Sequence, residues 1–259
     1  MQEPAPTSGN APVVRRIDYS DLKYAFGQGV KDFARAPVFG LVIAGLFALG
    51  GIIIFLQLTV WDSSWLILPV AVGFPLIGPF VVVGLYEVSH QLEQGRKPDW
   101  NSVIRRITSQ KDGQIPSIAF IVTFFFGMWF YLAHLVFALF FGLSAMTNVS
   151  ESYEILLSAN GLTMLAVGSV VGGILAFILF SISVVSFPLL VDREIDFVTG
   201  MITSVSAVLQ NLFVMISWAV LIAILTGIAM IPLFLGLLVV LPILGHATWH
   251  LYRRLVEPE

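Results

Sequence analysis

Long apolar segments separated by charged ones constrain this chain more than any other feature of its sequence. A helix needs roughly 20 apolar residues to cross a hydrocarbon core about 30 Å thick. Such segments lie near 38–60, 65–87, 117–143, 162–190, 211–230 and 233–252. The last two are divided at Pro232, because a single helix over both would be about 60 Å long and could not fit. We therefore predict an all-α bundle of six transmembrane helices.

The composition supports a membrane protein. Hydrophobic residues make up 58% of the 259 residues and charged residues only 11%, which is more apolar surface than a soluble core of this size could bury. The chain has no cysteine, so disulfides, thiolate metal sites and cysteine nucleophiles are excluded. No nucleic-acid partner is expected, although the net charge of −3 is by itself a poor guide because the basic residues are segregated along the chain.

The positions of lysine and arginine predict the orientation. The thirteen basic residues fall before the first segment, between the second and third, between the fourth and fifth, and after the sixth: Arg15, Arg16, Lys23, Lys31, Arg35, Arg96, Lys97, Arg105, Arg106, Lys111, Arg193, Arg253 and Arg254. Short loops rich in these residues stay cytoplasmic. We expect a multi-pass protein of a bacterial inner membrane with both termini in the cytoplasm.

The domain organisation is simple. Residues 1–17 contain several Pro and Gly and no apolar run, which is typical of a disordered cytoplasmic tail. Residues 18–254 are expected to form a single six-span membrane domain.

Three amphipathic stretches, 21–37, 99–116 and 196–211, each start with an acid and precede a pair of apolar segments. Helical spacing puts apolar residues on one face of the first (Leu22, Phe26, Val30, Phe33) and of the third (Phe197, Met201, Val205, Val208). Helices of this kind lie in the membrane interface. The recurrence indicates three parallel helix-hairpin repeats. The alternative is that any cytoplasmic loop of this length forms an interfacial helix.

The stretches DLKYAFGQGVKDFARAPVFG, LEQGRKPDW and PLLVDREIDFVTGMITSVSAVLQN resemble the recurring motifs of a bacterial integral membrane family, domain-of-unknown-function family 2189. The likeness extends over most of residues 20–250. It implies a multi-span inner-membrane protein of uncharacterised activity. Some members carry a cytochrome c oxidase label, and no catalytic residue is transferred by the resemblance.

The histidines argue against a catalytic oxidase subunit. Such a core needs more imidazole ligands than the four available, which are His90, His134, His246 and His250. Glu87 and His90 share a helix face, as do His246 and His250. These four residues lie near one membrane boundary and are a candidate metal or haem site. The alternative is that each marks the point where a helix leaves the membrane.

Coupled transporters place charged side chains inside their membrane spans. Asp, Glu, Lys and Arg are absent from the interior of the six segments, which argues against proton- or sodium-coupled transport. Serines 181, 183 and 186 are expected to bond to their own helix. Pro69, Pro75 and Pro79 break the second segment and could line a substrate path, as broken helices do in transporters. A packed kink is the alternative.

The sequence leads to one main hypothesis and two others. The main hypothesis is a non-catalytic accessory or assembly subunit of a membrane complex, for example a respiratory complex. The alternative is a carrier or channel for a neutral or lipid-like substrate through the proline-broken segment. The third is a metal- or haem-binding protein. No cofactor is required by the first two, and the partners expected are the lipid bilayer and other membrane subunits.

Overall fold

The computed structural model describes residues 12–60, 67–110, 113–142 and 156–258. Its helices are α1 (Tyr19–Arg35), α2 (Pro37–Thr59), α3 (Ile67–Glu93), α4 (Trp100–Ser109), α5 (Ile115–Phe141), α7 (Ala159–Ser183), α8 (Ser186–Asp192), α9 (Phe197–Gln210), α10 (Leu212–Met230) and α11 (Leu237–Leu255). Within these ranges the only β contact is an isolated bridge between Val14 and Val256. The predicted all-α fold class is confirmed.

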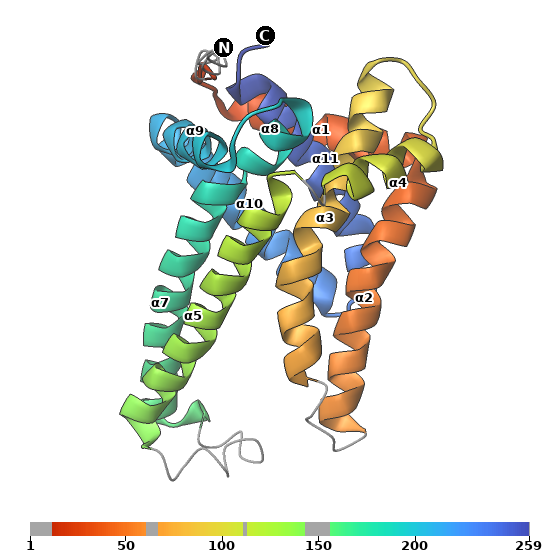
Figure 1. Ribbon diagram of the computed structural model, residues 1–259. Coiled ribbons are helices and arrows are strands. Elements are labelled where there is room, and N and C mark those ends of the chain that lie inside the picture. Colours follow the sequence, from red (N-terminus) through yellow and green to blue (C-terminus); the bar gives the residue numbers. More distant parts are fainter. Residues whose placement is uncertain (1–11, 61–66, 111–112, 143–155, 259) are drawn as a thin grey trace, which may run out of the picture.

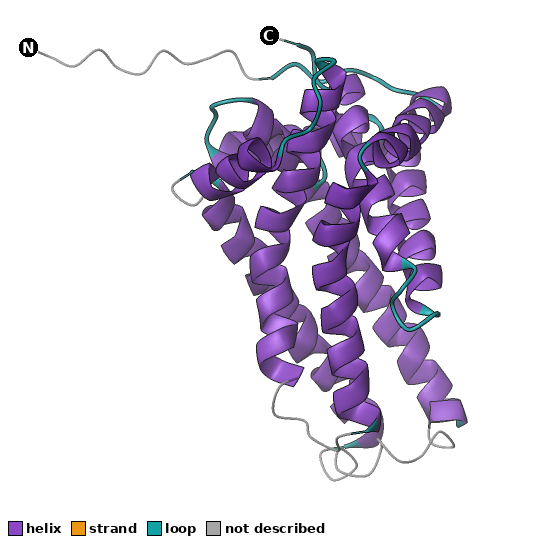
Figure 2. Cartoon of the chain, turned by 90° about the vertical axis from the view of Figure 1, so that its right-hand side faces the viewer, coloured by secondary structure: helices purple, strands orange, loops and turns teal. Residues whose placement is uncertain are grey.

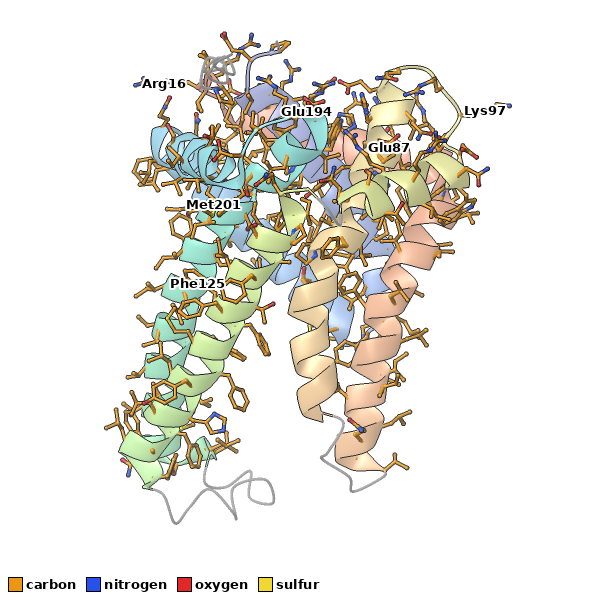
Figure 3. All side chains as sticks on the ribbon, viewed as in Figure 1. Arg16, Glu87, Lys97, Phe125, Glu194 and Met201 are labelled. Atoms are coloured by element: carbon orange, nitrogen blue, oxygen red, sulfur yellow. The ribbon has the colours of Figure 1, made fainter. Side chains whose placement is uncertain are left out.

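Short helices cover one end of a bundle of long ones. Helices α1, α4, α8 and α9 lie across the end that also carries both termini, while α2, α3, α5 and α7 extend away from it (Figure 1). The labelled charged side chains Arg16, Lys97 and Glu194 all lie there (Figure 3). We call this the charged end and the opposite one the far end. The clustering of basic residues along the sequence is thus matched in space.

Four stretches of the described residues are long and apolar enough to cross a membrane: Pro37–Gln57, Ile115–Phe141, Ala159–Asp192 and Leu212–Met230. Helices α3 and α11 are not among them. The count of six spans and the three hairpin repeats therefore stay predictions.

Each of the three amphipathic helices α1, α4 and α9 begins at an aspartate N-cap: Asp18, Asp99 and Asp196. The cap carboxylate accepts backbone N–H groups that have no partner in the first turn. Hydrogen bonds donated by residues of that turn lower the pKa of each of the three carboxyls below its ordinary value. The acidic start predicted for the first stretch was Asp21. The cap is Asp18 instead, and Asp21 closes the capping box.

The face of α1 that packs on the protein overlaps its apolar face only in part. Its buried residues are Leu22, Ala25, Gly29 and Asp32, while Val30 of the apolar face is 41% exposed. A Cβ on Gly29 would lie 2.6 Å from the carbonyl oxygen of Ile243 in α11. The two helices approach so closely here that a residue with a side chain would not fit at position 29.

The same division of faces occurs on α9. Small or polar residues are buried on it: Gly200, Thr203, Ser204 and Ala207, together with Val208. The larger Ile202 and Leu209 are about two-thirds exposed, at 65% and 64%. Both helices thus bury small or polar residues beside a large apolar one, Leu22 on α1 and Val208 on α9, and leave other large apolar residues exposed, as a helix at a membrane interface would.

The two chain ends are tied together at the charged end. The backbone N–H of Arg15 donates to the carbonyl of Leu255 over 2.7 Å, and that of Glu257 donates to Val13 over 3.0 Å. The backbone N–H of Ile17 donates to Oδ1 of Asn211, at the junction of α9 and α10, over 2.8 Å. Residues 12–17, predicted as part of a disordered tail, are therefore hydrogen-bonded, while residues 1–11 lie outside the described chain. The single domain over 18–254 stays a prediction.

The hydrophobic core is concentrated at the charged end. Large buried side chains include Trp249, Leu251, Tyr252 and Leu255 of α11, which contact residues of α1, α3 and α8 in one cluster. The C-terminal half of α11 therefore lies at the centre of this end, and it places several polar side chains inside the protein.

Candidate functional site: a buried polar network at the charged end

Four polar side chains meet between α1, α3 and α11. The hydroxyl of Ser89 donates to Oδ2 of Asp32 over 2.9 Å, and its Oγ lies 2.8 Å from Nδ1 of His246. Nε2 of His250 lies 2.7 Å from the same Asp32 oxygen. Asp32 is 3% exposed, and Ser89 and His246 are fully buried. The buried Asp32 carboxylate is thus contacted by a hydroxyl and an imidazole, and a second imidazole extends the network.

The close approach of α1 to α11 brings Asp32 into this position. Gly29 permits the approach, and Asp32 lies three residues further along the same helix face. His246 and His250 are four residues apart on α11 and so face α1 and α3 together. Ser89 projects from the last turns of α3 toward them. A charge pair removed from water is tolerated only when its remaining hydrogen-bonding sites are filled, and Ser89 fills one of them.

The hydrogen bonds of this network hold α1, α3 and α11 together. Ser89 has one proton, which it donates to Asp32, so it can accept a hydrogen bond from His246. A hydroxyl with no exposed surface cannot reach a substrate, so nucleophilic catalysis by Ser89 is not supported. Nε2 of His246 has no hydrogen-bond partner among the described residues. The network can fix three helices against one another and hold a proton.

A second polar group lies on another face of α3. Nε of Arg106 in α4 lies 3.8 Å from Oε2 of Glu87, and Nδ1 of His90 lies 3.9 Å from the same oxygen. Nε2 of Gln91 donates to the other oxygen over 2.6 Å. The guanidinium of Arg106 also donates to the carbonyl of Val191 at the end of α8. Glu87 therefore connects α3, α4 and α8, and Figure 3 shows it at the charged end.

A third group joins the ends of α3, α8 and α11. The guanidinium of Arg253 lies 3.0 Å from Glu93 and 3.1 Å from Asp192. The hydroxyl of Tyr252 donates to the same oxygen of Asp192 over 2.5 Å. Both pairs reach solvent, so they add little stability by themselves. Their effect is to hold α8 against the C-terminal half of α11.

The sequence-predicted metal residues are divided between two of these groups. Glu87 and His90 belong to the group with Arg106, while His246 and His250 belong to the network with Asp32 and Ser89. Across the described residues, no three His, Asp or Glu side chains gather as metal ligands would. Metal or haem binding stays a prediction, which metal analysis of the purified protein and a His246→Ala, His250→Ala variant would test.

Sequence reasoning missed Asp32 and Ser89. The missed signal was Gly29, one turn before Asp32, because a glycine inside an amphipathic helix suggests close approach of another backbone.

The proline residues of the predicted substrate path lie inside α3, which continues from Ile67 to Glu93 without interruption. Pro79 is buried. The side chains of Pro69 and Pro75 lie outside the described part. The serines behave as expected: Ser181, Ser183 and Ser186 donate to carbonyls four residues earlier in the chain, each over 2.7 Å.

Three hollows lie at membrane depth. Grooves of about 520 and 320 Å³ follow one seam between α5 and α7, and both are lined by Trp129 and Gly172. A cavity of about 230 Å³ lies between α2, α3, α10 and α11, beside Phe47, Val82 and Leu241. The linings are mostly apolar, so each suits a hydrocarbon or a helix surface better than an ion.

Comparisons with known proteins agree with the helical membrane architecture. No curated protein and no solved structure matches the chain. One family model matches residues 67–192, which comprise α3, α4, α5, α7 and α8. This segment includes LEQGRKPDW but not the α1 stretch, so the match is shorter than the resemblance over residues 20–250. Over residues 67–192 the chain is similar to the family described as predicted integral membrane protein (DUF2189).

Proposed function

We propose that this protein is a non-catalytic accessory or assembly subunit that binds another membrane protein through α5 and α7. The observation that carries the proposal is the low burial of α5. Only 6% of its apolar window is buried by the rest of the protein, compared with 33% for α2. A transmembrane helix with so few fully buried residues leaves much of its surface open to lipid or to a partner helix.

The seam between α5 and α7 supports a helix as the partner. Gly168, Gly172 and Gly173 line it on α7, and small residues let transmembrane helices approach closely. On α5 the seam is lined by large aromatic side chains such as Phe126 and Trp129. Figure 1 shows α5 and α7 diverging from α2 and α3 toward the far end, so the pair is accessible from within the membrane.

The polar groups at the charged end are consistent with a contact role. Asp32, Glu87 and Asp192 each bind side chains of this chain, so their charges stabilise the fold. Nothing in this arrangement requires a substrate.

A substitution that fills the groove tests the proposal. A Cβ on Gly173 would meet no atom within 4 Å, so Gly173→Leu fills the groove without disturbing the fold. Gly227 on α10 has equally open surroundings, and Gly227→Leu is the matched control. Tagged protein extracted in a mild detergent should retain a partner in stoichiometric amount, and Gly173→Leu should reduce its recovery several-fold while Gly227→Leu does not.

Two results would contradict the proposal. One is an unmodified protein that remains a partner-free monomer after mild extraction. The other is a partner retained equally by both variants.

The cavity between α2, α3, α10 and α11 favours a second candidate, a carrier for a neutral or lipid-like substrate. Val82, which lines it, lies three residues after the buried Pro79, so the cavity adjoins the kinkable part of α3. Its 230 Å³ could hold part of an acyl chain. Movement of a labelled lipid analogue across vesicles that contain the purified protein would support this candidate over the first.

A further inference from the structure

The turn between α10 and α11 has an unusual composition. Its residues are Ile231, Pro232, Leu233, Phe234, Leu235 and Gly236, and none has a polar side chain. Ile231 is 79% exposed, Leu233 50% and Leu235 53%. Turns in water are dominated by Gly, Pro, Asn, Asp and Ser, whose polar members bond to the backbone. A turn of exposed aliphatic residues instead suits an apolar surrounding.

The depth of this turn follows from contacts between α11 and α2. A Cβ on Gly40 would lie 2.7 Å from Cβ of Pro242, and a Cβ on Gly51 would lie 2.5 Å from the ring of Phe234. The turn is therefore level with Gly51. Helix α2 continues for eight more residues to Thr59, about 12 Å at 1.5 Å per residue. Figures 1 and 2 show the turn ending short of the far ends of α2, α5 and α7.

The backbone of the turn is hydrogen-bonded without help from water. The N–H of Leu233 donates to Ile231 over 2.9 Å, that of Phe234 to Met230 over 3.1 Å, and that of Leu235 to Pro232 over 3.0 Å. Pro232 has no N–H to satisfy. Non-helical backbone inside a membrane is tolerated only where its polar groups have partners. This turn meets most of that demand internally.

We propose that the turn 231–236 is embedded in the hydrocarbon of the far leaflet and contacts lipid acyl chains. Helices α10 and α11 then form a hairpin that enters and leaves the membrane at the charged end, with no loop exposed to water at the far end. The apolar side chains at 231, 233 and 235 are its lipid-contacting surface. The inference is independent of the partner proposed for α5 and α7.

The absence of cysteine from the sequence allows a direct test. Leu233→Cys, and Ile231→Cys as a second variant, are labelled with an environment-sensitive fluorophore in detergent and reconstituted into phosphatidylcholine vesicles. Quenching is measured with aqueous iodide and with brominated acyl chains. Lys97→Cys, in the exposed α3–α4 loop (Figure 3), is the water-exposed control. Val170→Cys, on the 63% exposed outer face of α7, is the lipid-exposed control.

The labels at 231 and 233 should behave like that at Val170. Iodide should quench them several-fold less than the label at Lys97, and brominated chains should quench them strongly. Iodide quenching equal to that at Lys97 would overturn the proposal by placing the turn in water. Protection from both quenchers would also overturn it, because protein and not lipid would then cover the turn.

Discussion

At the scale of single residues, the buried contact between the Asp32 carboxylate and His250 is the most consequential feature. Removing a charge from water costs several kcal/mol, and a buried pair recovers this cost only with good geometry and additional hydrogen bonds. The 2.7 Å contact with His250 and the 2.9 Å bond from Ser89 supply both. The pair therefore contributes more to specifying how α1 docks than to net stability.

Loss of the Asp32 carboxylate should destabilise the protein strongly. Asp32→Ala leaves His250 and Ser89 without their acceptor, which should cost about 3 kcal/mol, and this loss should lower Tm by roughly 10 °C. Thermal unfolding of the purified protein in detergent measures the change. Lys31→Ala, at the exposed neighbouring position on α1, is the control and should leave Tm nearly unchanged.

A double-mutant cycle separates the Ser89 bond from the rest. Ser89→Ala combined with Asp32→Ala should cost clearly less than the two single changes added together, because the two groups share one hydrogen bond. Additive costs would mean that Ser89 does not support Asp32.

At the scale of elements, the amphipathic helices were predicted in the right places, while the faces that pack on the protein were not predicted. Their positions follow from local signals, an acid at the N-cap and an apolar periodicity, so α1, α4 and α9 were predictable. Periodicity cannot tell whether an apolar face meets protein or lipid. In α1 the face with Ala25 and Gly29 packs against the rest of the protein, and Val30 is exposed.

The two glycines of α1 should respond oppositely to alanine. A Cβ on Gly29 would lie 2.6 Å from a carbonyl oxygen of α11, whereas a Cβ on Gly27 would meet no atom within 4 Å. Gly29→Ala should lower the free energy of unfolding by about 1–3 kcal/mol through overpacking. Gly27→Ala should raise it by about 0.5–1 kcal/mol, because alanine is the better helix former. Equal effects in denaturant unfolding would contradict the close approach of α1 and α11.

At the scale of the whole molecule, one end carries the charged side chains, both chain ends and most of the core, as far as the chain is described, and the helices that extend from it are largely apolar. The polar groups of α3, α8 and α11 connect across this end through Glu87, Glu93 and Asp192. The N-terminal and C-terminal segments complete it by pairing with each other. The fold is thus a compact cap from which membrane helices extend.

The pairing of the chain ends predicts that a disulfide forms when cysteines replace the two paired residues. Residues facing each other in an antiparallel bridge have Cα atoms about 4.5–5.5 Å apart, within the range of about 4.4–6.8 Å for a disulfide. Val14→Cys with Val256→Cys should therefore oxidise to a single intramolecular bond, detected by thiol counting and intact mass. Val13→Cys with Val256→Cys is the control and should oxidise poorly, because successive side chains on a strand point to opposite faces.

The sequence by itself determined the all-α class, the membrane setting, the grouping of cations and the acidic helix starts. Each of these depends on composition or on residues a few positions apart, where the bilayer and the helix terminus impose strict requirements. The tertiary structure alone decided that Asp32 meets Ser89 and His250, which are 57 and 218 residues away, and that the α10–α11 turn stops level with Gly51. These contacts depend on which helix faces meet. A single sequence leaves that choice open because lipid and protein satisfy an apolar face equally well.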